Sequence, residues 1–314
     1  MSIGTSNQTA VYYTPEVTFG VTPATPLFTK VRITGETLKR DFKNIVSDEI
    51  RADRNRAESI RVGEGVAGDL NFELSIGSFN DVIQAVLGST WSAPVTSLSS
   101  IKNGLVQRSF SLQKRVLDTT ATFYENFVGC RFDALSLKFA PNEFLTGTIG
   151  VVGKTSSISA VIITGQTTAA DVTTIPLNCA ADITAITDSG VTSTEIYKSL
   201  TIDIKNNMRM LDAIGSTGPR EINAGSFDVT GNLEIYFQNS TVYTRIINDT
   251  AFAMSITVTD DNGDYYKFTL PRIKLETAEI TAGGLDQDMV VNCTYRAVYD
   301  TVTLATIAIE KLDV

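Results

Sequence analysis

The chain has 314 residues, of which 43% are hydrophobic and 19% are charged, and its formal net charge is −9. This length allows about two average domains with real hydrophobic cores, so folding requires neither disulfides nor a bound metal. The complete absence of histidine excludes Ser-His-Asp and Cys-His catalysis and His-ligated metals, and the acidic excess argues against tight binding of nucleic acid.

Neither a membrane span nor a signal peptide is predicted. No apolar run approaches the roughly 18 residues of a membrane helix, and residues 1–14 lack the basic and apolar regions of a secretion signal. We therefore expect a soluble protein that is made in the cytoplasm and has no membrane contact. Its three cysteines, Cys130, Cys179 and Cys293, include no C-x-x-C pair and are interpreted as buried or half-buried thiols.

The composition predicts a mainly β protein. There are 41 threonines, Val, Ile, Phe and Tyr are common, and long helical windows are missing. Residues 1–26 contain Pro15, Pro23 and Pro26, so we expect an extended N-terminal arm there. A strand is predicted at residues 29–34.

Residues 45–65 carry a dense mixture of acidic and basic side chains, which predicts a long solvated loop. A role in nucleic-acid binding is disfavoured because the acids nearly cancel the arginines and no aromatic residues are interspersed for base stacking. The better functional hypothesis is a set of intersubunit salt bridges. Its candidate residues are Arg51, Asp53, Arg54, Arg56, Glu58 and Arg61.

The remaining first half alternates in hydrophobicity, with one change of period. Residues 68–76 alternate as a half-buried strand. Residues 79–87 are apolar at helical spacing, with Ser78 as a candidate cap and Gly88 as a stop. Further strands are predicted at 109–115, 134–139 and 145–152, and residues 155–196 are interpreted as a linker with short strands.

From residue 197 onward the earlier pattern returns. Strands are predicted at 200–204 and 227–237, followed by a helix with Val242, Tyr243, Ile246 and Ile247 on one face and Asn248 at its end. Residues 255–259 and 265–270 flank an Asn-Gly turn, which is typical of a β-hairpin.

The two halves can be aligned. Gly68, Leu70, Phe72 and Leu74 match Gly231, Leu233, Ile235 and Phe237, and the two predicted helices then coincide. We also align residues 109–115 with 267–273, and 135–151 with 275–291. The sequence thus predicts two β-sandwich units, each with a short flanking helix, at residues 27–154 and 197–314. The second unit includes a C-terminal tail.

Three short motifs are weighed and set aside. Gly63, Gly65 and Gly68 spell G-x-G-x-x-G but precede a strand rather than a helix, so a phosphate site is disfavoured. The acidic run 260–264 lacks EF-hand spacing and is interpreted as a hairpin turn. Asp286 and Asp288, expected at the start of a strand, could do acid–base work, but a solvated row is the better interpretation. We therefore expect no enzyme, no metal and no cofactor.

Several segments together resemble the tail tube (major tail) proteins of long, non-contractile-tailed bacteriophages. These segments are residues 18–23, 68–88, 134–154, 224–236, 268–274 and 295–300. The resemblance covers nearly the whole chain and is weakest over 155–196.

The resemblance implies a structural virion protein with a β-sandwich fold. In this family six such units form a ring whose inner sheets join into an intersubunit β-barrel, and the rings stack into a tube that conducts DNA into the host. A two-unit chain would complete a ring with three copies, and six copies is the alternative. The implied partners are further copies, tail-tip, terminator and tape-measure proteins, and double-stranded DNA that passes without specific binding.

Other functions remain as alternatives at this point. A tail terminator or another injection-tube protein would share the β-sandwich but stop at single rings. A carbohydrate-binding module would need exposed aromatic platforms, and the chain has one tryptophan, Trp91.

Overall fold

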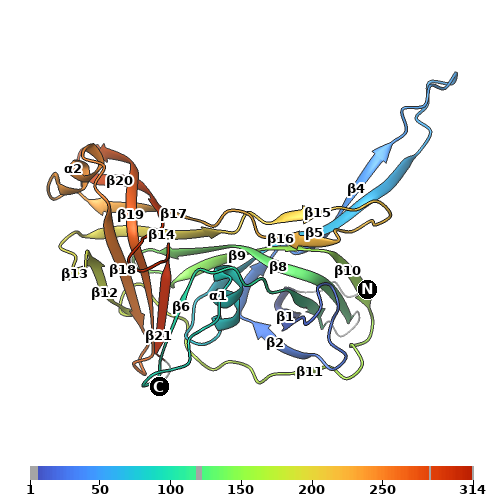
Figure 1. The fold of residues 1–314 in the computed structure, drawn as a ribbon, viewed down its shortest axis with the longest axis horizontal. Helices are drawn as coiled ribbons and strands as arrows, with labels where there is room; N and C mark the ends of the chain where they lie inside the picture. Colours follow the sequence, from blue (N-terminus) through green and yellow to red (C-terminus); the bar gives the residue numbers. More distant parts are fainter. Residues whose placement is uncertain (1–5, 118–121, 283, 313–314) are drawn as a thin grey trace.

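The computed structural model describes residues 6–117, 122–282 and 284–312, and strands dominate these residues (Figure 1). They contain a short 3-10 helix (Ser6–Gln8), α1 (Asn80–Leu87) and α2 (Thr241–Ile247). Among them, neither α-helix has the length and apolarity needed to cross a membrane. The strands are β1 (Thr9–Pro15), β2 (Leu27–Val31), β3 (Ile33–Glu36), β4 (Lys39–Val46), β5 (Ser59–Glu73), β6 (Leu98–Lys102), β7 (Phe110–Val116), β8 (Phe123–Phe139), β9 (Thr146–Gly153), β10 (Thr155–Ser159), β11 (Thr167–Thr168), β12 (Ile183–Asp188), β13 (Val191–Thr192), β14 (Tyr197–Lys205), β15 (Arg209–Leu211), β16 (Glu221–Asn223), β17 (Asp228–Tyr236), β18 (Phe252–Thr259), β19 (Tyr265–Thr281), β20 (Val290–Ala297) and β21 (Ala308–Leu312).

One continuous antiparallel sheet, which we call the inner sheet, runs through both halves of the chain (Figure 1). Its strands follow the order β3 and β4 together, β5, β9, β8, β14, β17, β20 and β19. The halves meet where β8 pairs with β14, with Leu137 opposite Ile202. Because successive side chains point to opposite faces, one face of this sheet is apolar and the other is polar.

Smaller antiparallel layers lie against the apolar face, one for each half. In the first, β1 pairs with β2 and β7, and the first part of β8 joins β7 to β10. In the second, β12 pairs with β13 and β18, and the first part of β19 joins β18 to β21, which pairs with β6. The long strands β8 and β19 thus belong to both layers, and a β-bulge near the middle of each marks the change.

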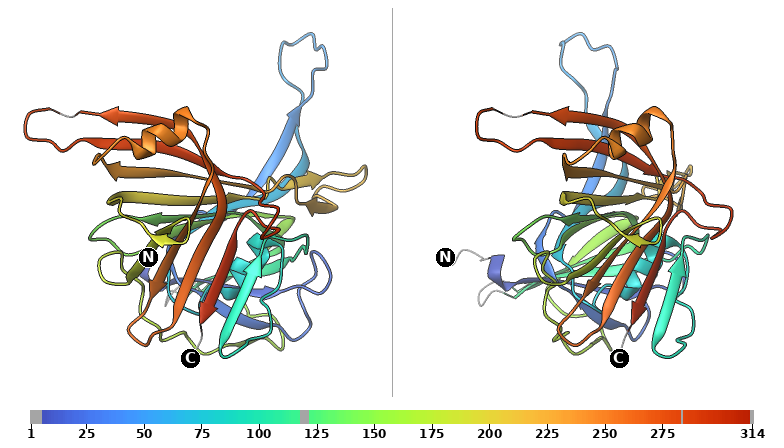
Figure 2. Two further views of the ribbon diagram at one scale, coloured as in Figure 1. Left: turned by 60° about the vertical axis from the view of Figure 1, so that its left-hand side comes forward. Right: turned by 90° about the vertical axis from the view of Figure 1, so that its left-hand side faces the viewer.

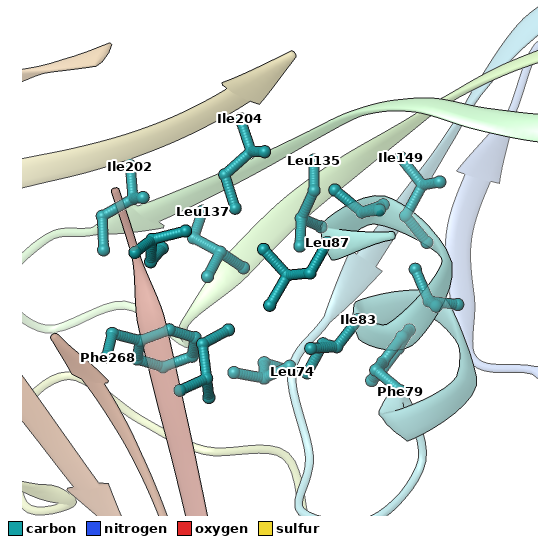
Figure 3. Packing of buried hydrophobic residues seen from close by; sticks show 14 of the residues in the cluster. Leu74, Phe79, Ile83, Leu87, Leu135, Leu137, Ile149, Ile202, Ile204 and Phe268 are labelled. Carbon is teal, nitrogen blue, oxygen red and sulfur yellow. The ribbon is translucent and has the colours of Figure 1, made fainter. Parts of the chain in front are cut away.

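The core lies between these layers, and α1 fills its centre (Figure 3). Val82, Ile83, Val86 and Leu87 are at most 2% exposed, so each contributes about 1.5–3 kcal/mol by leaving water. The helix ends at Gly88 in the left-handed conformation, as predicted. Ser78 does not cap the helix, however. Its hydroxyl instead bonds Ser75 at 2.8 Å, and Phe79 occupies the N-cap position.

The duplication predicted from the sequence is confirmed by strand pairing. In both halves a strand pairs with the strand before the helix, and three β-bulges recur at equivalent places. The bulge between Ile33 and Gly35, for example, recurs between Tyr197 and Ser199. Recurring irregularities are stronger evidence for duplication than alternating hydrophobicity, because any two strands share the alternation.

Two parts of the sequence alignment were wrong. The strand predicted at 109–115, which is β7, corresponds to β18 and not to residues 267–273, since β7 pairs with β8 as β18 pairs with β19. The later strands match in type but are shifted, because Leu135 corresponds to Ala278 through their shared partner positions on β9 and β20. A period of two residues cannot fix such a register.

The segment expected as an N-terminal arm is partly a core strand. Residues 9–15 form β1, and Val11 and Tyr13 are buried, while Pro15 ends the strand where its missing N–H is tolerated. Residues 1–5 of the arm and 313–314 of the tail lie outside the described residues. Short strands do lie within 155–196. We propose that β1 and β2 belong to the first unit and β12 and β13 to the second, because each pair occupies the same place in its layer.

Thiol reactivity gives a direct check of this core. Burial raises the pKa of Cys293 to about 11 and raises that of Cys130 well above its usual range. Since the thiolate is the reactive form, we expect Cys130 and Cys293 of the native protein to resist a thiol-reactive chromogenic disulfide at pH 8. In denaturant all three cysteines should react. Rapid reaction of two or more thiols in the native protein would contradict the described core.

Candidate assembly surfaces

A long β-hairpin formed by β4 and β5 projects beyond the rest of the inner sheet (Figure 1). The sequence predicted a loop over 45–65, but β4 continues to Val46 and β5 begins at Ser59, so the loop covers only residues 47–58. Ile45 pairs with Ile60 and Asn44 with Arg61. Residues 48–62 are all exposed, so the hairpin has no core of its own to bury.

The six predicted contact residues all lie on this hairpin, but they do not form one cluster. Arg51 contacts Asp53 at 2.9 Å. Arg56 instead contacts Asp48 at 2.6 Å, a partner that the sequence analysis left out of the candidate set. A hydrogen bond from Arg51 lowers the pKa of Asp53 to about 2, so this pair stays ionised over the whole physiological range. Exposed pairs of this kind contribute little to stability.

The other three candidates have different local roles. Arg54 adopts the left-handed conformation, with φ 63°, at the tip of the loop. The Glu58 carbonyl accepts a hydrogen bond from the Ser47 N–H at 3.1 Å, which closes the hairpin. Arg61 lies on the aromatic ring of Phe42, 3.6 Å from its centroid. The hairpin therefore presents charged groups on a locally ordered ribbon.

At its base the hairpin borders an open groove of about 710 Å³. The opposite wall is the segment between β14 and β17, which is held in place because Thr217 C=O accepts from the Glu64 N–H at 2.8 Å. The groove is lined by exposed apolar side chains, among them Phe42, Val62, Met210 and Ile214. Apolar groups gathered on a protein surface indicate a contact with another molecule.

Glu64 stabilises the groove's wall. Burial opposes its ionisation, but hydrogen bonds from Arg40 and Thr155 outweigh that effect and lower the pKa of Glu64. The sequence analysis did not identify this residue. Its neighbours Gly63 and Gly65 belong to the glycine motif set aside above, and its partner Arg40 is 24 residues away.

The polar face of the inner sheet carries rows of hydroxyl, amide and charged side chains. One row crosses seven strands, each member lying beside the next. Hydrogen bonds also join some neighbouring side chains on this face. Ser136 donates to Asp203, and Thr277 bonds Thr294 at 2.7 Å. The row contains Glu73, Thr146, Lys138, Thr201, Asn232, Thr294 and Thr277.

Both lateral edges of the inner sheet are open within the described part of the chain. At one end β3 and β4 pair only with β5. At the other end, residues 274–281 of β19 pair only with β20 and extend outward as a hairpin (Figure 2). An unpaired strand edge is a template for another strand.

The second helix, α2, is less buried than its apolar face predicted. Of the four residues expected on its apolar face, Val242 alone is buried, whereas Tyr243 is 42% and Ile247 is 68% exposed. The equivalent face of α1 is fully covered. The pattern of apolar residues was correct, but the chain itself supplies no cover for α2.

The motifs set aside above have structural roles. Gly63, Gly65 and Gly68 lie within β5. Asp260 accepts hydrogen bonds from the N–H groups of Asn262 and Asp264, at 2.9 and 3.0 Å, and closes the predicted hairpin. The pair expected at a strand start, Asp286 and Asp288, lies in the loop before β20. Among the described residues no group of three or more Cys, Asp and Glu is placed to hold a metal.

Comparison with known protein families identifies a match over most of the chain. A family model described as phage tail tube protein matches residues 6–297, which is nearly the whole chain and includes both halves. No curated protein matches the chain.

Proposed function

Because this chain belongs to the phage tail tube protein family, we propose that three copies of it close a ring and that such rings stack into the tube of the phage tail. The chain is thus a structural component of the virion tail. The observation that best supports a ring of three copies is the inner sheet, in which two equivalent four-strand units already lie side by side. One chain then supplies two of the six units in a ring.

The size of such a ring is compatible with the passage of DNA. Three copies contribute about 24 inner strands. At a spacing of about 4.8 Å and a tilt of about 40°, these strands form a barrel roughly 48 Å across its backbone. Side chains leave a channel wider than the roughly 20 Å of duplex DNA.

We place the polar face of the inner sheet toward this channel. The opposite face is covered by the core, and the polar face offers hydroxyl, amide and charged groups, with carboxylates such as Asp203 accepting hydrogen bonds from neighbouring side chains. The net charge of −9 disfavours adhesion of phosphates. DNA therefore slides through during ejection without specific binding, and the chain has no catalytic role.

Stacking requires contacts between rings, and we assign these to the β4–β5 hairpin and its basal groove. The hairpin extends beyond the sheet and carries the candidate residues Arg51, Asp53, Arg54, Arg56, Glu58 and Arg61. Its exposed charges and the apolar groove complement a second copy in the neighbouring ring. The ends of the tube meet the tip and terminator proteins, and the tape-measure protein fills the channel before ejection.

The mass of the ring tests the stoichiometry. A chain of 34.0 kDa gives about 102 kDa for three copies and about 204 kDa for six. We expect negative-stain electron microscopy of the purified protein, seeded with tail tips if needed, to show stacked rings, and mass photometry to give the lower value. Rings of the higher mass would overturn the ring of three and leave the tube. Single rings that never stack would favour a terminator.

A further inference from the structure

The contact between the two units of one chain provides a template for the contact between chains. Within the chain, β8 at the edge of the first unit pairs with β14 at the edge of the second, and we call this pairing the internal joint. The two open edges of the inner sheet are formed by the strands equivalent to these, namely β19 for β8, and β3 with β4 for β14. The strand pairing that joins the first unit to the second can therefore also join the second unit to the first unit of the next copy.

The equivalence is defined residue by residue. Residues 33–41 correspond to 197–205, because both pair with the strand before the helix at the same positions and share a bulge one residue from the start. Residues 131–138 correspond to 274–281, because both pair with the following strand at the same positions and share a second bulge. Each residue of the internal joint thus has one counterpart at an open edge.

We propose that β19 of one copy pairs antiparallel with β3 and β4 of the next copy, in the register that joins β8 to β14. This inference rests on the ring proposed above and specifies its interface. The resulting pairs are Glu36 with Ala282, Thr37 with Thr281, Leu38 with Ile280, Lys39 with Glu279, Arg40 with Ala278, and Asp41 with Thr277.

Side-chain chemistry agrees with this register. Lys39 and Glu279 are opposite charges that both lie on the polar face, and both are exposed in the single chain. Leu38 and Ile280 both lie on the apolar face. Ile280 is 37% exposed, whereas its counterpart Leu137 is 2% exposed inside the internal joint. A register shifted by one residue would place charged groups against the core.

At the open edge formed by β3 and β4, a backbone N–H group is already oriented to pair with another strand. The Thr37 N–H donates to Asp69 on β5 at 2.9 Å, so the next N–H, that of Leu38, faces away from β5. In the single chain this N–H is satisfied by the Glu36 carboxylate at 2.9 Å. In the proposed pair it donates to the Ile280 carbonyl, just as backbone groups do across an internal ladder.

The exposed face of α2 lies beside the same edge and is explained by the same contact. Its counterpart α1 is covered from the second unit: Ile202, Ile204 and Phe268 share a cluster with Ile83 and Leu87 (Figure 3). Tyr266 also donates a hydrogen bond to the Asn80 side chain at the start of α1, at 2.7 Å. The next copy's first unit would cover Tyr243 and Ile247 of α2 as the second unit covers α1.

Disulfide trapping tests the register. Since the Leu38 N–H bonds across the interface, Lys39 and Glu279 form the neighbouring pair without backbone hydrogen bonds, where side chains lie closest. We expect assembled Lys39→Cys/Glu279→Cys rings to give covalent trimers on oxidation. An equal mixture of the two single variants should stop at dimers. The matched controls Lys39→Cys/Thr277→Cys and Lys39→Cys/Thr281→Cys, on the same face but two residues away, should crosslink at least tenfold less.

A charge exchange provides a second, independent readout. Lys39→Glu places a carboxylate opposite Glu279 at each of three interfaces in a ring, so we expect at least a tenfold loss of rings with an unchanged melting temperature of the single chain. Glu279→Lys in the same chain should restore them. Normal rings that crosslink best at a control pair would overturn the register and leave the proposed function intact. Failure of the unmodified chain to form any ring, even when seeded, would overturn both.

Discussion

Shortening the β4–β5 hairpin should stop tube growth at single rings while leaving the fold intact. Ser47 and Glu58 are joined by a backbone hydrogen bond at 3.1 Å, so residues 48–57 can be replaced by Asn-Gly, which closes a two-residue hairpin. The removed residues are all exposed, and the core of β5 begins at Val66. We therefore expect an unchanged melting temperature and at least a tenfold loss of rings in stacks, measured by electron microscopy.

A less drastic variant separates the hairpin's length from its charges. Arg51→Gln combined with Arg56→Gln keeps the hairpin but removes the partners of Asp53 and Asp48. Tubes that are shorter or more sensitive to salt would show that these charges contribute to stacking. Long tubes from the shortened protein would contradict the assignment of the hairpin to contacts between rings.

Gly231→Ala should destabilise the fold severely, by at least about 3 kcal/mol. A Cβ atom at this position would lie 2.1 Å from the Thr201 carbonyl oxygen and 2.6 Å from the Tyr295 hydroxyl. Both belong to neighbouring strands of the inner sheet, so the backbone itself would have to move. Urea unfolding of the soluble fraction measures the loss, and poor solubility would be the first sign of it.

Two further glycines make this prediction specific. Gly68 is the equivalent of Gly231 in the first unit, and a Cβ there would lie 2.5 Å from the Thr37 carbonyl oxygen, so Gly68→Ala should be comparably harmful. Gly284→Ala is the matched control, because nothing lies within 4 Å of its Cβ position. Equal stabilities for the Gly231 and Gly284 variants would contradict the close approach of the strands.

The charges at the open edges have a second consequence for the single chain. Open strand edges favour indiscriminate pairing, and charged side chains on an edge reduce it. Lys39 and Glu279 therefore stand where they discourage the pairing of two like edges and favour the pairing of unlike ones. This accounts for an assembly of head-to-tail contacts that closes into a ring.

Much of the candidate site could be read from the sequence because it depends on local patterns. The mixed charges of 45–65 were correctly placed on an exposed element, although the strands continue into it, because exposed strand residues need not alternate. The second helix was correctly located, but its burial was not, since the same apolar face is equally suited to a core or to a neighbouring copy.

The sequence by itself determined the β class, the absence of histidine chemistry, both helices and the duplicated units, since composition, period and repeated glycines are local properties of the chain. Only the tertiary structure decided the registers, the role of residues 9–15 in the core, the joint between β8 and β14, and which strand edges stay open. Those features depend on which distant segments pair, and an alternating pattern is satisfied by many partners. The physical reason is that side chains select a face of a strand, whereas backbone hydrogen bonds, which are the same for every residue, select its neighbour.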